Sequence, residues 1–503
     1  MDLNPISFIL ASPLRAIGTS IAAIWLFTVF LCIYRLFFHP LSKFPGPKLA
    51  AITDHYYGLS WIGGFHPFRL KELHDKYGDI VRIAPNELSF ASVTSYREIY
   101  SHATKGKKPF LKSTFYYQPE VPPNIFTVLD PREHSRQRRY LAHGFSAQAL
   151  REQEKVIHHY VNMFLNQLGR LGVPGGKGVD MTEAFHWVSF DIIGDLAFGE
   201  SFDAVAQART HPWIALVGDA GKTTVLGDIL NRAPLIRLML PYILPGIYKR
   251  AQEHQALTHE KGKKRIEFGL DGGDKDFFAQ VLRKGEITGD ELVNQAITLL
   301  IAGSETTSTA LAATTNYLLR NPETLQKLQE EVRGTFRSLE EITGDSTSKL
   351  QYLIATIEEG LRIFTPLPTS PPRVSPGATV DGHFIPAGVI VSSATWTTQH
   401  DPRYWRDPEC FKPERWIEGG FGDNKDASQP FSLGPRGCIG INLAWLEMRV
   451  ILAKLAFMYD WELAESSMHT RWFEESTFQL LWKKPQLRII FNPRQLTTED
   501  ASA

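Results

Sequence analysis

The longest run of apolar residues in the chain lies near the N-terminus. AIGTSIAAIWLFTVFLCIY, residues Ala16 to Tyr34, carries no charge and is bounded by Arg15 and Arg35. This length is close to the ~20 residues that a helix needs to cross a bilayer. A buried core helix would show a polar face. A cleaved signal peptide would have a shorter apolar core and a small-residue cleavage site. We therefore expect a retained, single-span membrane anchor.

The segment after the apolar run is rich in proline. FPGPK, residues Phe44 to Lys48, predicts a stiff and non-helical break between the anchor and the rest of the chain. Basic residues after the run (Arg35, Lys43 and Lys48) outnumber those before it, which favours a cytosolic body. The expected parts are an anchor over 1–39, a proline-rich hinge over 40–50, one large domain over 51–495 and a tail over 496–503.

Helical periodicity dominates the middle of the chain, and short strands cluster towards its two ends. DIVRIA and ELSFAS follow the hinge as strand-like pieces, and most of the pattern from Asp130 to Arg362 is helical. Proline and glycine become dense after Pro366, where GVIVSSA reads as a strand; a last helix follows Cys438, and LRIIF reads as a final strand. The pattern predicts a mainly α fold with minor β structure.

The clearest helix begins at Thr288 and ends before Asn321-Pro322. TGDE predicts a capping box at its start, with Glu291 at the third helical position. A span of roughly 30 residues corresponds to about 45 Å at the rise of an α-helix. Such a helix crosses the whole molecule.

The middle of this helix is apolar except for one polar patch, Ser304 to Thr309. In one interpretation the hydroxyls bond back to their own helix and Glu305 finds an ion partner. In the other, Gly303 thins the helix, the helix opens locally over a reaction centre, and Thr306 and Glu305 relay protons. A buried carboxylate is costly unless it is paired or hydrated, and both interpretations stay open.

Two further motifs carry paired charges. In EEGLR, Glu359 and Arg362 are three residues apart and share one helix face, which taken alone is typical of a surface ion pair. In the later loop FKPERW, Glu414 and Arg415 supply another acid and another base.

Composition narrows the class of protein. The chain has 54 basic and 54 acidic residues, so its zero net charge gives no indication of a nucleic-acid partner. Its three cysteines make no disulfide framework, and it has no N-x-S/T glycosylation acceptor. The body therefore fits a reducing compartment such as the cytosol.

Cys438 stands in an unusual setting, PFSLGPRGCIG, just before a long helix. A zinc ligand would need nearby cysteine or histidine companions, which are missing here; a catalytic nucleophile with a distant base stays possible. A buried structural thiol would not explain the glycines. A haem-iron thiolate explains more, because a helix N-terminus and backbone N–H groups stabilise the sulfur anion. Gly434, Gly437 and Gly440 would let the backbone approach a flat macrocycle, Phe431 would pack beside the sulfur, and Arg436 would pair with a propionate.

These motifs resemble those of the cytochrome P-450 superfamily of haem-thiolate monooxygenases. Phe431, Gly434, Arg436, Cys438 and Gly440 match its signature F-x-x-G-x-R-x-C-x-G. AGSETT is similar to its oxygen-activating helix, Glu359-x-x-Arg362 to its E-x-x-R motif, and Arg415 to the arginine that completes that triad. The resemblance covers nearly the whole chain, including the anchor and the FPGP hinge.

The resemblance implies a haem b cofactor with Cys438 as the thiolate ligand of iron. It implies that Arg138, Arg373 and His134 bind the haem propionates, although the family usually has tryptophan where this sequence has His134. Glu359, Arg362 and Arg415 would form a buried network that fixes the cysteine loop. Glu305 and Thr306 would route protons.

The implied reaction inserts one atom of O2 into a C–H bond of a hydrophobic small molecule, with electrons from an NADPH-cytochrome P-450 reductase. The style of the chain resembles fungal enzymes that hydroxylate terpenoids or polyketides, on the endoplasmic reticulum membrane with the catalytic domain in the cytosol. Two rival functions are a redox-neutral haem-thiolate isomerase or dehydratase, and a membrane-anchored binding protein without chemistry. The expected pocket residues are Phe115, Tyr116, Ile301, Ala302, Leu367 and Phe478.

Overall fold

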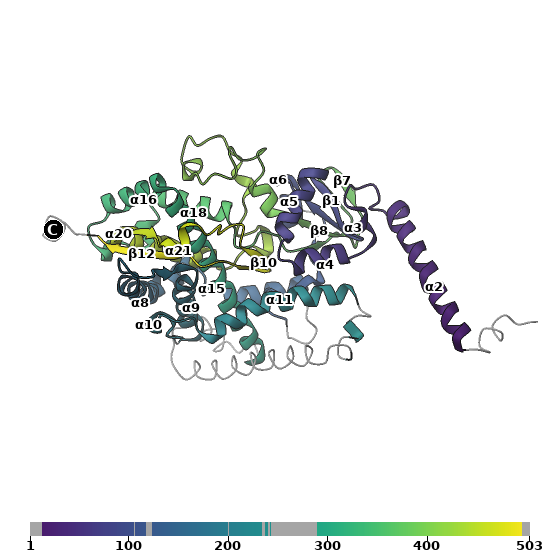
Figure 1. The fold of residues 1–503 in the computed structure, drawn as a ribbon, viewed down its shortest axis with the longest axis horizontal. Coiled ribbons are helices and arrows are strands. Elements are labelled where there is room, and N and C mark those ends of the chain that lie inside the picture. Colours follow the sequence, from purple (N-terminus) through teal and green to yellow (C-terminus); the bar gives the residue numbers. More distant parts are fainter. Residues whose placement is uncertain are drawn as a thin grey trace, which may run out of the picture.

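In the described part of the computed structural model, helices predominate and pack around four small sheets (Figure 1). The structure describes residues 13–104, 106–116, 123–199, 201–233, 237–239, 242 and 289–494. Residues 1–12 of the expected anchor, the expected tail and Thr288 of the expected capping box lie outside these ranges. The predicted fold class, mainly α with minor β, is confirmed.

The α-helices of the body lie mostly in the middle of the chain. They are α3 (Lys48–Ile52), α4 (His55–Ile62), α5 (His66–Tyr77), α6 (Val93–Tyr100), α7 (Pro131–Ala142), α8 (Ala147–Leu171), α9 (Met181–Phe198), α10 (Ala204–Gln207), α11 (Pro212–Arg232), α15 (Gly289–Arg320), α16 (Pro322–Thr335), α17 (Gly344–Thr347), α18 (Gln351–Ile363), α19 (Thr395–Gln399), α20 (Ile441–Met458) and α21 (Glu465–Met468). Short 3-10 turns are η2 (Thr114–Tyr116), η3 (Leu339–Glu341), η4 (Pro413–Trp416), η5 (Lys425–Ala427) and η6 (Gly434–Arg436).

Most of the strands lie towards the two ends of the chain, as the pattern predicts, but one short strand, Val179–Asp180, lies in the middle. They are β1 (Ile80–Ala84), β2 (Glu87–Phe90), β3 (Leu111–Lys112), β4 (Val179–Asp180), β5 (Arg373–Val374), β6 (Ala378–Val380), β7 (His383–Ile385), β8 (Ile390–Ser393), β9 (Tyr459–Leu463), β10 (Thr477–Gln479), β11 (Leu481–Lys483) and β12 (Arg488–Pro493). The largest sheet has the order β1-β2-β8-β5-β3, and its β2–β8 pair is parallel, with Leu88 opposite Val391. The smaller sheets are β4-β12-β9, β10-β11 and β6-β7.

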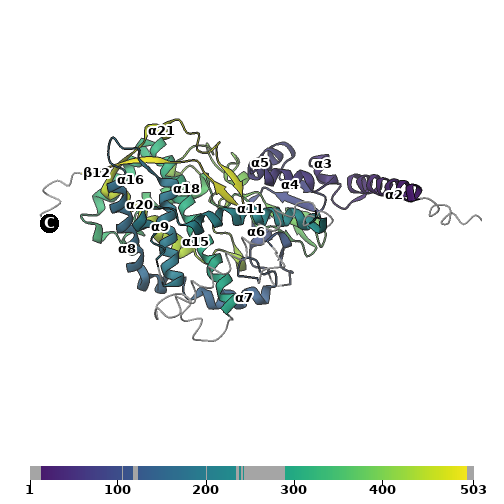
Figure 2. The same cartoon turned by 60° about the horizontal axis from the view of Figure 1, so that its bottom comes forward.

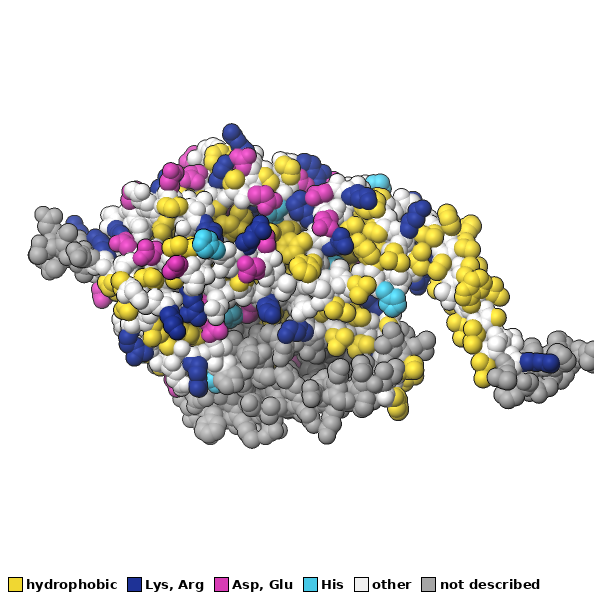
Figure 3. Space-filling model, viewed as in Figure 1, with side chains coloured by type: hydrophobic (Ala, Val, Ile, Leu, Met, Phe, Trp, Pro, Cys, Tyr) yellow, Lys and Arg dark blue, Asp and Glu magenta, His cyan; other side chains and the backbone are white. Residues whose placement is uncertain are grey.

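The N-terminal helix projects from the body (Figure 1). It consists of α2 (Pro13–Ile33) and one π-helical turn, η1 (Tyr34–Phe38). The span Arg15–Phe38 has a mean hydropathy of 2.2, and its apolar window is entirely unburied. It is the one helix of the described residues that is long and apolar enough to cross a membrane. In the space-filling view this helix is almost entirely apolar, whereas the body beside it carries mixed charges (Figure 3).

The segment after the anchor packs against the body. Leu41 and Phe44 are buried, and the Pro45 carbonyl accepts a hydrogen bond from the Arg82 amide at 2.8 Å. The Arg82 guanidinium donates to the Arg35 carbonyl at 2.8 Å, which ties η1 to strand β1. The expected non-helical break is one residue shorter than predicted, because Lys48 is the first residue of α3.

The long helix α15 forms the centre of the helical layer, where α9 and α18 pack against it (Figure 2). Its bounds agree with the predicted helix, and Pro322 begins α16 directly after it. Gly303 lets α9 approach closely, since a Cβ there would lie 2.9 Å from the Ile193 side chain. The helix is continuous from Gly289 to Arg320, so the interpretation in which the helix opens locally is wrong for this structure.

Candidate functional site

The loop that carries Cys438 lies between η6 and the start of α20. Gly434 has φ +69°, and a Cβ there would lie 2.2 Å from the Tyr100 carbonyl oxygen, so the loop can pass this backbone only with glycine. The Cys438 amide donates to the Phe431 carbonyl at 2.8 Å, which folds the loop back on itself. Gly434 is therefore required by packing against the protein itself, a reason that the sequence did not reveal.

The Cys438 side chain is accessible to solvent, but many protein atoms lie around its sulfur. Burial raises the pKa of its thiol, while a hydrogen bond from the Gly440 backbone and the charge of Arg138 act in the opposite direction. Gly440 caps α20, so the sulfur lies at the N-terminal end of that helix, as predicted. Phe431 is half-buried, with its ring 6.4 Å from that of Trp445. The sulfur needs a further positive charge to be a stable anion here, and a bound metal ion supplies one.

The arrangement does not fit a zinc site. Among the residues that the structure describes, no three His, Cys, Asp or Glu side chains come together in a way that could hold a metal ion. Cys410 is exposed and Cys32 lies in the anchor helix, so the chain offers Cys438 no cysteine companion.

One face of α15 is open in its middle. Ala302 is exposed, and Ile301 and Thr306 are partly exposed, whereas residues 307–316 of the same helix are buried. Ala302 and Thr306 are four residues apart and share this face. The Thr306 hydroxyl donates to the Ala302 carbonyl at 2.6 Å, so it bonds back to its own helix. The hydroxyl remains within reach of a ligand on this face.

Glu305 points to a different, buried side of α15. Its Oε1 lies 2.8 Å from Nζ of Lys484, and its Oε2 lies 3.2 Å from Nε2 of His186 on α9. Thr309 completes the group, since Lys484 also donates to its hydroxyl at 2.6 Å. The ion partner that one interpretation of the sequence required is therefore Lys484.

The charges around Glu305 and His186 determine which of the two side chains is ionised. Burial opposes ionisation of Glu305, but the Lys484 charge, then His186 and hydrogen bonds, bring its pKa below the ordinary value. Burial lowers the pKa of His186 to about 4 despite the nearby Glu305. At neutral pH the carboxylate of Glu305 is therefore charged and the imidazole of His186 is neutral.

The second acidic motif forms a fully buried network. Arg362 donates from Nε and Nη2 to the two oxygens of Glu359, each at 2.8 Å, and Arg415 donates to Glu359 Oε1 at 3.0 Å. Arg415 also pairs with Asp423, so two arginines meet two carboxylates. The side chains of Glu359, Arg362 and Arg415 are completely inaccessible to solvent. The expectation from the resemblance, a buried network, agrees with this geometry, and the surface-pair alternative does not.

A third group of side chains is basic. Arg138 donates to the Gly437 carbonyl at 2.8 Å, and Arg436 donates to the Leu129 carbonyl at 3.1 Å. Helix α7 supplies Arg138 and buried His134, and its start is fixed by Asp130, which accepts from two amides of the first turn. Arg373 on β5 is also buried. We call Lys112, His134, Arg138, Arg373 and Arg436 the cation cluster.

The members of the cation cluster act on one another. Burial and then Arg373 lower the pKa of Arg436 to about 10. Burial, with the charges of Arg436, Arg138, Lys112 and Arg373, lowers the pKa of His134 to about 4. One guanidinium nitrogen of Arg436, Nη1, is buried without a hydrogen-bond partner. The cluster therefore favours an anionic ligand.

Lys112 is the member that sequence reasoning missed. It lies on the two-residue strand β3, paired with β5, so that it stands opposite Arg373 in the register. It is buried, donates to the Phe126 carbonyl, and has a pKa well below the ordinary value because of burial and the charges of Arg436 and Arg373. The sequence contained one signal, a lysine in a stretch without any other charged residue, LKSTFYY.

The residues present fit a haem group. A haem b presents two propionate carboxylates, which match the donors of the cation cluster, and an iron that matches the sulfur of Cys438. The orphaned Arg436 Nη1 is the observation that an anion would satisfy.

Two of the expected pocket residues come together around one tryptophan. The ring of Phe115 lies 5.4 Å from that of Trp61, and the ring of Phe478 lies 6.0 Å from it. Leu367 packs on the same core. Ile301 and Ala302 lie on the open face of α15, and the side chain of Tyr116 is outside the described part of the structure. The role of these residues as a substrate pocket stays a prediction.

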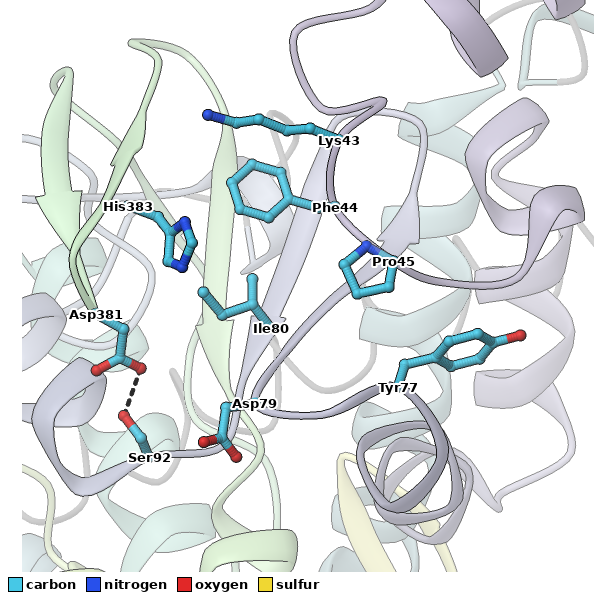
Figure 4. A pocket seen from close by; sticks show the side chains of 9 residues that line it. All are labelled: Lys43, Phe44, Pro45, Tyr77, Asp79, Ile80, Ser92, Asp381 and His383. Atoms are coloured by element: carbon cyan, nitrogen blue, oxygen red, sulfur yellow. Dashed lines mark hydrogen bonds between the residues drawn. The ribbon is translucent and has the colours of Figure 1, made fainter.

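A separate open pocket of about 540 Å³ lies at the junction between the segment after the anchor and the body (Figure 4). Phe44 and His383 meet edge to face there, and Ser92 donates to Asp381 at 2.5 Å. None of the predicted site residues lines it. Its lining is Lys43, Phe44, Pro45, Tyr77, Asp79, Ile80, Ser92, Asp381 and His383.

Comparison with known proteins agrees with this geometry. Residues 57–491 match the family described as Cytochrome P450. The chain is 44% identical to Cytochrome P450 monooxygenase BOA3 of Botryotinia fuckeliana (strain B05.10), over 94% of this chain and 96% of that protein. It is 42% identical to Cytochrome P450 monooxygenase poxC of Penicillium oxalicum, over 91% of each chain. It is 37% identical to the Trichothecene C-15 hydroxylase of Fusarium sporotrichioides, over 96% of this chain and 99% of that protein.

These relatives are fungal monooxygenases, and proteins of the family bind haem through a cysteine thiolate. The match spans nearly the whole described body and includes the Cys438 loop, α15 and the buried Glu359 network. The chain is therefore an oxidoreductase with a haem cofactor, and it belongs to the cytochrome P450 family.

Proposed function

We propose that this chain inserts one oxygen atom from O2 into a hydrophobic fungal secondary metabolite, with Cys438 as the thiolate ligand of a haem b. The observation that carries the proposal is the position of Cys438, open to a ligand at the start of α20 beside the cation cluster. When bound, a thiolate-ligated haem supplies O–O bond cleavage.

The chain's own residues hold the cofactor and keep the thiolate charged. The Gly440 amide donates to the sulfur, and Arg138 supports its negative charge while fixing the Gly437 carbonyl. Arg436, Arg373 and Lys112 would pair with the propionates, which would remove the repulsion among these buried cations, and His134 would donate a hydrogen bond to a propionate. The Glu359 network fixes the η4 turn that precedes the cysteine loop.

The open face of α15 would present Thr306 to the bound oxygen and substrate. Its hydroxyl can exchange its bond to the Ala302 carbonyl for one to a ligand or a water molecule, so that it holds and passes a proton. Glu305 would recharge this relay from the buried side of the helix. Ala302, Ile301 and the aromatic residues Phe115 and Phe478 would contribute an apolar surface for the substrate.

The apolar character of the expected pocket residues and the names of the relatives support the proposed class of substrate. A relative that is named as a trichothecene C-15 hydroxylase supports hydroxylation of a compact apolar skeleton, such as a terpenoid or a polyketide. Electrons would come from an NADPH-cytochrome P450 reductase.

The apolar N-terminal helix supports a membrane location for this chemistry. We infer an anchor over 1–39, a linking segment over 40–50, a catalytic domain over 51–495 and a tail over 496–503, on the endoplasmic reticulum with the body in the cytosol. The excess of basic residues after the apolar span supports this orientation.

The proposal is tested by coexpressing the full chain with a fungal reductase in membranes and supplying candidate terpenoids and polyketides. We expect products that are heavier by one oxygen atom, that incorporate label from 18O2, and that require NADPH. Turnover without NADPH and without added oxygen would indicate an isomerase or dehydratase. Purified protein without haem would indicate a binding protein.

A further inference from the structure

Lys484 occupies an unusual place for a lysine. It follows strand β11, where Trp482 is buried and Lys483 is exposed, so the alternation of a strand directs residue 484 inwards. Its side chain is only 2% exposed. Burying an ammonium group is costly unless a specific partner meets it, so the two adjacent lysines have different roles.

The partner of Lys484 is the acid of the predicted proton relay. Nζ of Lys484 lies 2.8 Å from Glu305 Oε1 and 2.6 Å from the Thr309 hydroxyl. The charged or titratable groups that act on the Glu305 carboxylate are Lys484, after β11, and His186, on α9. Three distant segments of the chain therefore meet at this one carboxylate.

We propose that Lys484 is a positioning residue that holds Glu305 ionised and turned away from Thr306. The proposal rests on the proposed monooxygenase function for its catalytic part. The Lys484 pair competes directly with any movement of the carboxylate towards Thr306, because the pair holds Oε1 of that carboxylate. When the pair opens, the carboxylate takes up a proton from water, passes it towards Thr306 and becomes ionised again.

Removing the lysine charge reverses the electrostatic balance at Glu305. In wild type, Lys484 keeps the Glu305 pKa below its ordinary value, and without it burial alone would raise that pKa. A buried acid with a lowered pKa contributes stability above its unfolded pKa. A buried acid with a raised pKa makes the protein less stable as pH rises above the unfolded pKa of ~4.3.

The first test is the pH dependence of thermal unfolding of the haem-loaded full chain in detergent, for Lys484→Met, Lys484→Arg and the matched surface variant Lys483→Met. We expect the Tm of Lys484→Met to fall increasingly below that of wild type as pH rises from about 5 to 8. Lys484→Arg and Lys483→Met should follow the wild-type profile. A Lys484→Met profile parallel to wild type would overturn the proposal.

A double variant keeps this test decisive if Lys484→Met does not accumulate. Lys484→Met combined with Glu305→Gln leaves no unpaired charge, so this double variant should fold and its Tm should lose the added pH dependence. Failure of the double variant to accumulate would mean that Lys484 acts through packing alone, which would overturn the proposal.

The second test is the fraction of NADPH that ends in product, measured from about pH 6 to 8. We expect this fraction to be steady in wild type and in Lys484→Arg, and to fall with rising pH in Lys484→Met as its Glu305 loses a proton. A shifted stability profile with an unchanged product profile would overturn the catalytic part. If wild type forms no oxygenated product, the proposed function fails, and the stability profile still decides whether Lys484 holds Glu305 ionised.

Discussion

Two buried clusters of basic side chains differ in how their charge is balanced. In the Glu359 network, Arg362 and Arg415 meet Glu359 and Asp423, and the central hydrogen bonds are 2.8 to 3.0 Å long. In the cation cluster, the bonds of Arg138 and Arg436 described above go to backbone carbonyls, and neighbouring cations lower the pKa of Arg436 and His134. The first cluster is complete within the protein, whereas the second is arranged for an anion.

This difference separates structural residues from ligand-binding residues that look alike in the sequence. Both clusters consist of buried arginines contributed by distant segments, and exposure alone does not distinguish them. The balance of charge does, because a buried cation without a counter-charge is costly and a balanced pair is much less so. Substitutions in the two clusters should therefore have different consequences for the protein with and without haem.

The largest effect is expected when the balanced network is broken. Arg362→Ala leaves Glu359 buried with one partner fewer, and removing one partner of a buried pair costs roughly 3–5 kcal/mol. Typical proteins have only ~5–15 kcal/mol of stability, so we expect little haem-loaded protein. The measurement is haem content together with size-exclusion chromatography of the detergent extract.

A matched control for this variant is Arg69→Ala. Arg69 also pairs with a glutamate three residues away, Glu72 at 2.6 Å, but their side chains are 52% and 64% exposed. Exposed pairs contribute about 0–1 kcal/mol, so Arg69→Ala should accumulate as wild type does. Equal behaviour of the two variants would contradict the assignment of the Glu359 network as structural.

A smaller effect, confined to the haem-loaded state, is expected in the cation cluster. Hydrogen bonds to charged groups contribute about 1.5–3 kcal/mol, so Arg436→Leu should weaken haem retention about 10- to 100-fold. Without haem the same variant should be as stable as wild type or more so, because one of several repelling charges is gone. Haem transfer to an excess of apomyoglobin measures retention, and thermal unfolding of the apoprotein measures stability. An apoprotein destabilised as much as the holoprotein would show that Arg436 is structural.

The smallest expected effect is on the loss of stability at low pH that His134 causes. Its folded pKa of about 4 lies below the ordinary histidine value of 6.5, so the unfolded chain binds a proton first as pH falls. Stability of the apoprotein should therefore decrease as pH falls through this window. A propionate beside His134 would favour its charged form, so His134→Asn should reduce the acid sensitivity of the apoprotein more than that of the holoprotein. Equal reductions would place His134 away from the propionate.

The sequence predicted those features that depend on local pattern or on a known motif. The anchor, the bounds of α15, the terminal strands and the Cys438 loop follow from runs, periods and glycines within a few residues. The sequence did not predict that α15 is unbroken, because the Ser304–Thr309 patch is compatible both with hydroxyls that bond back to the helix and with a helix that opens.

The partners of buried charges could not be predicted, because they come from distant parts of the chain. Lys484 is 179 residues from Glu305, and Lys112 lies beside Arg373 only through the pairing of β3 with β5. Once strand β11 is known, the alternation of side chains along it is enough to predict that Lys484 points inwards and Lys483 outwards. Only the structure shows why residue 434 is glycine, because the backbone of Tyr100 occupies the place that a Cβ would need.

The most direct test of the central claim is the absorption spectrum of the reduced carbon monoxide complex. Wild type and Cys410→Ser, which changes an exposed cysteine, should both give the red-shifted Soret band of a thiolate-ligated haem. Cys438→Ser should lose this band whether or not haem remains bound. A thiolate-type band in Cys438→Ser, or its loss in Cys410→Ser alone, would contradict the assignment of Cys438 as the ligand of the haem iron.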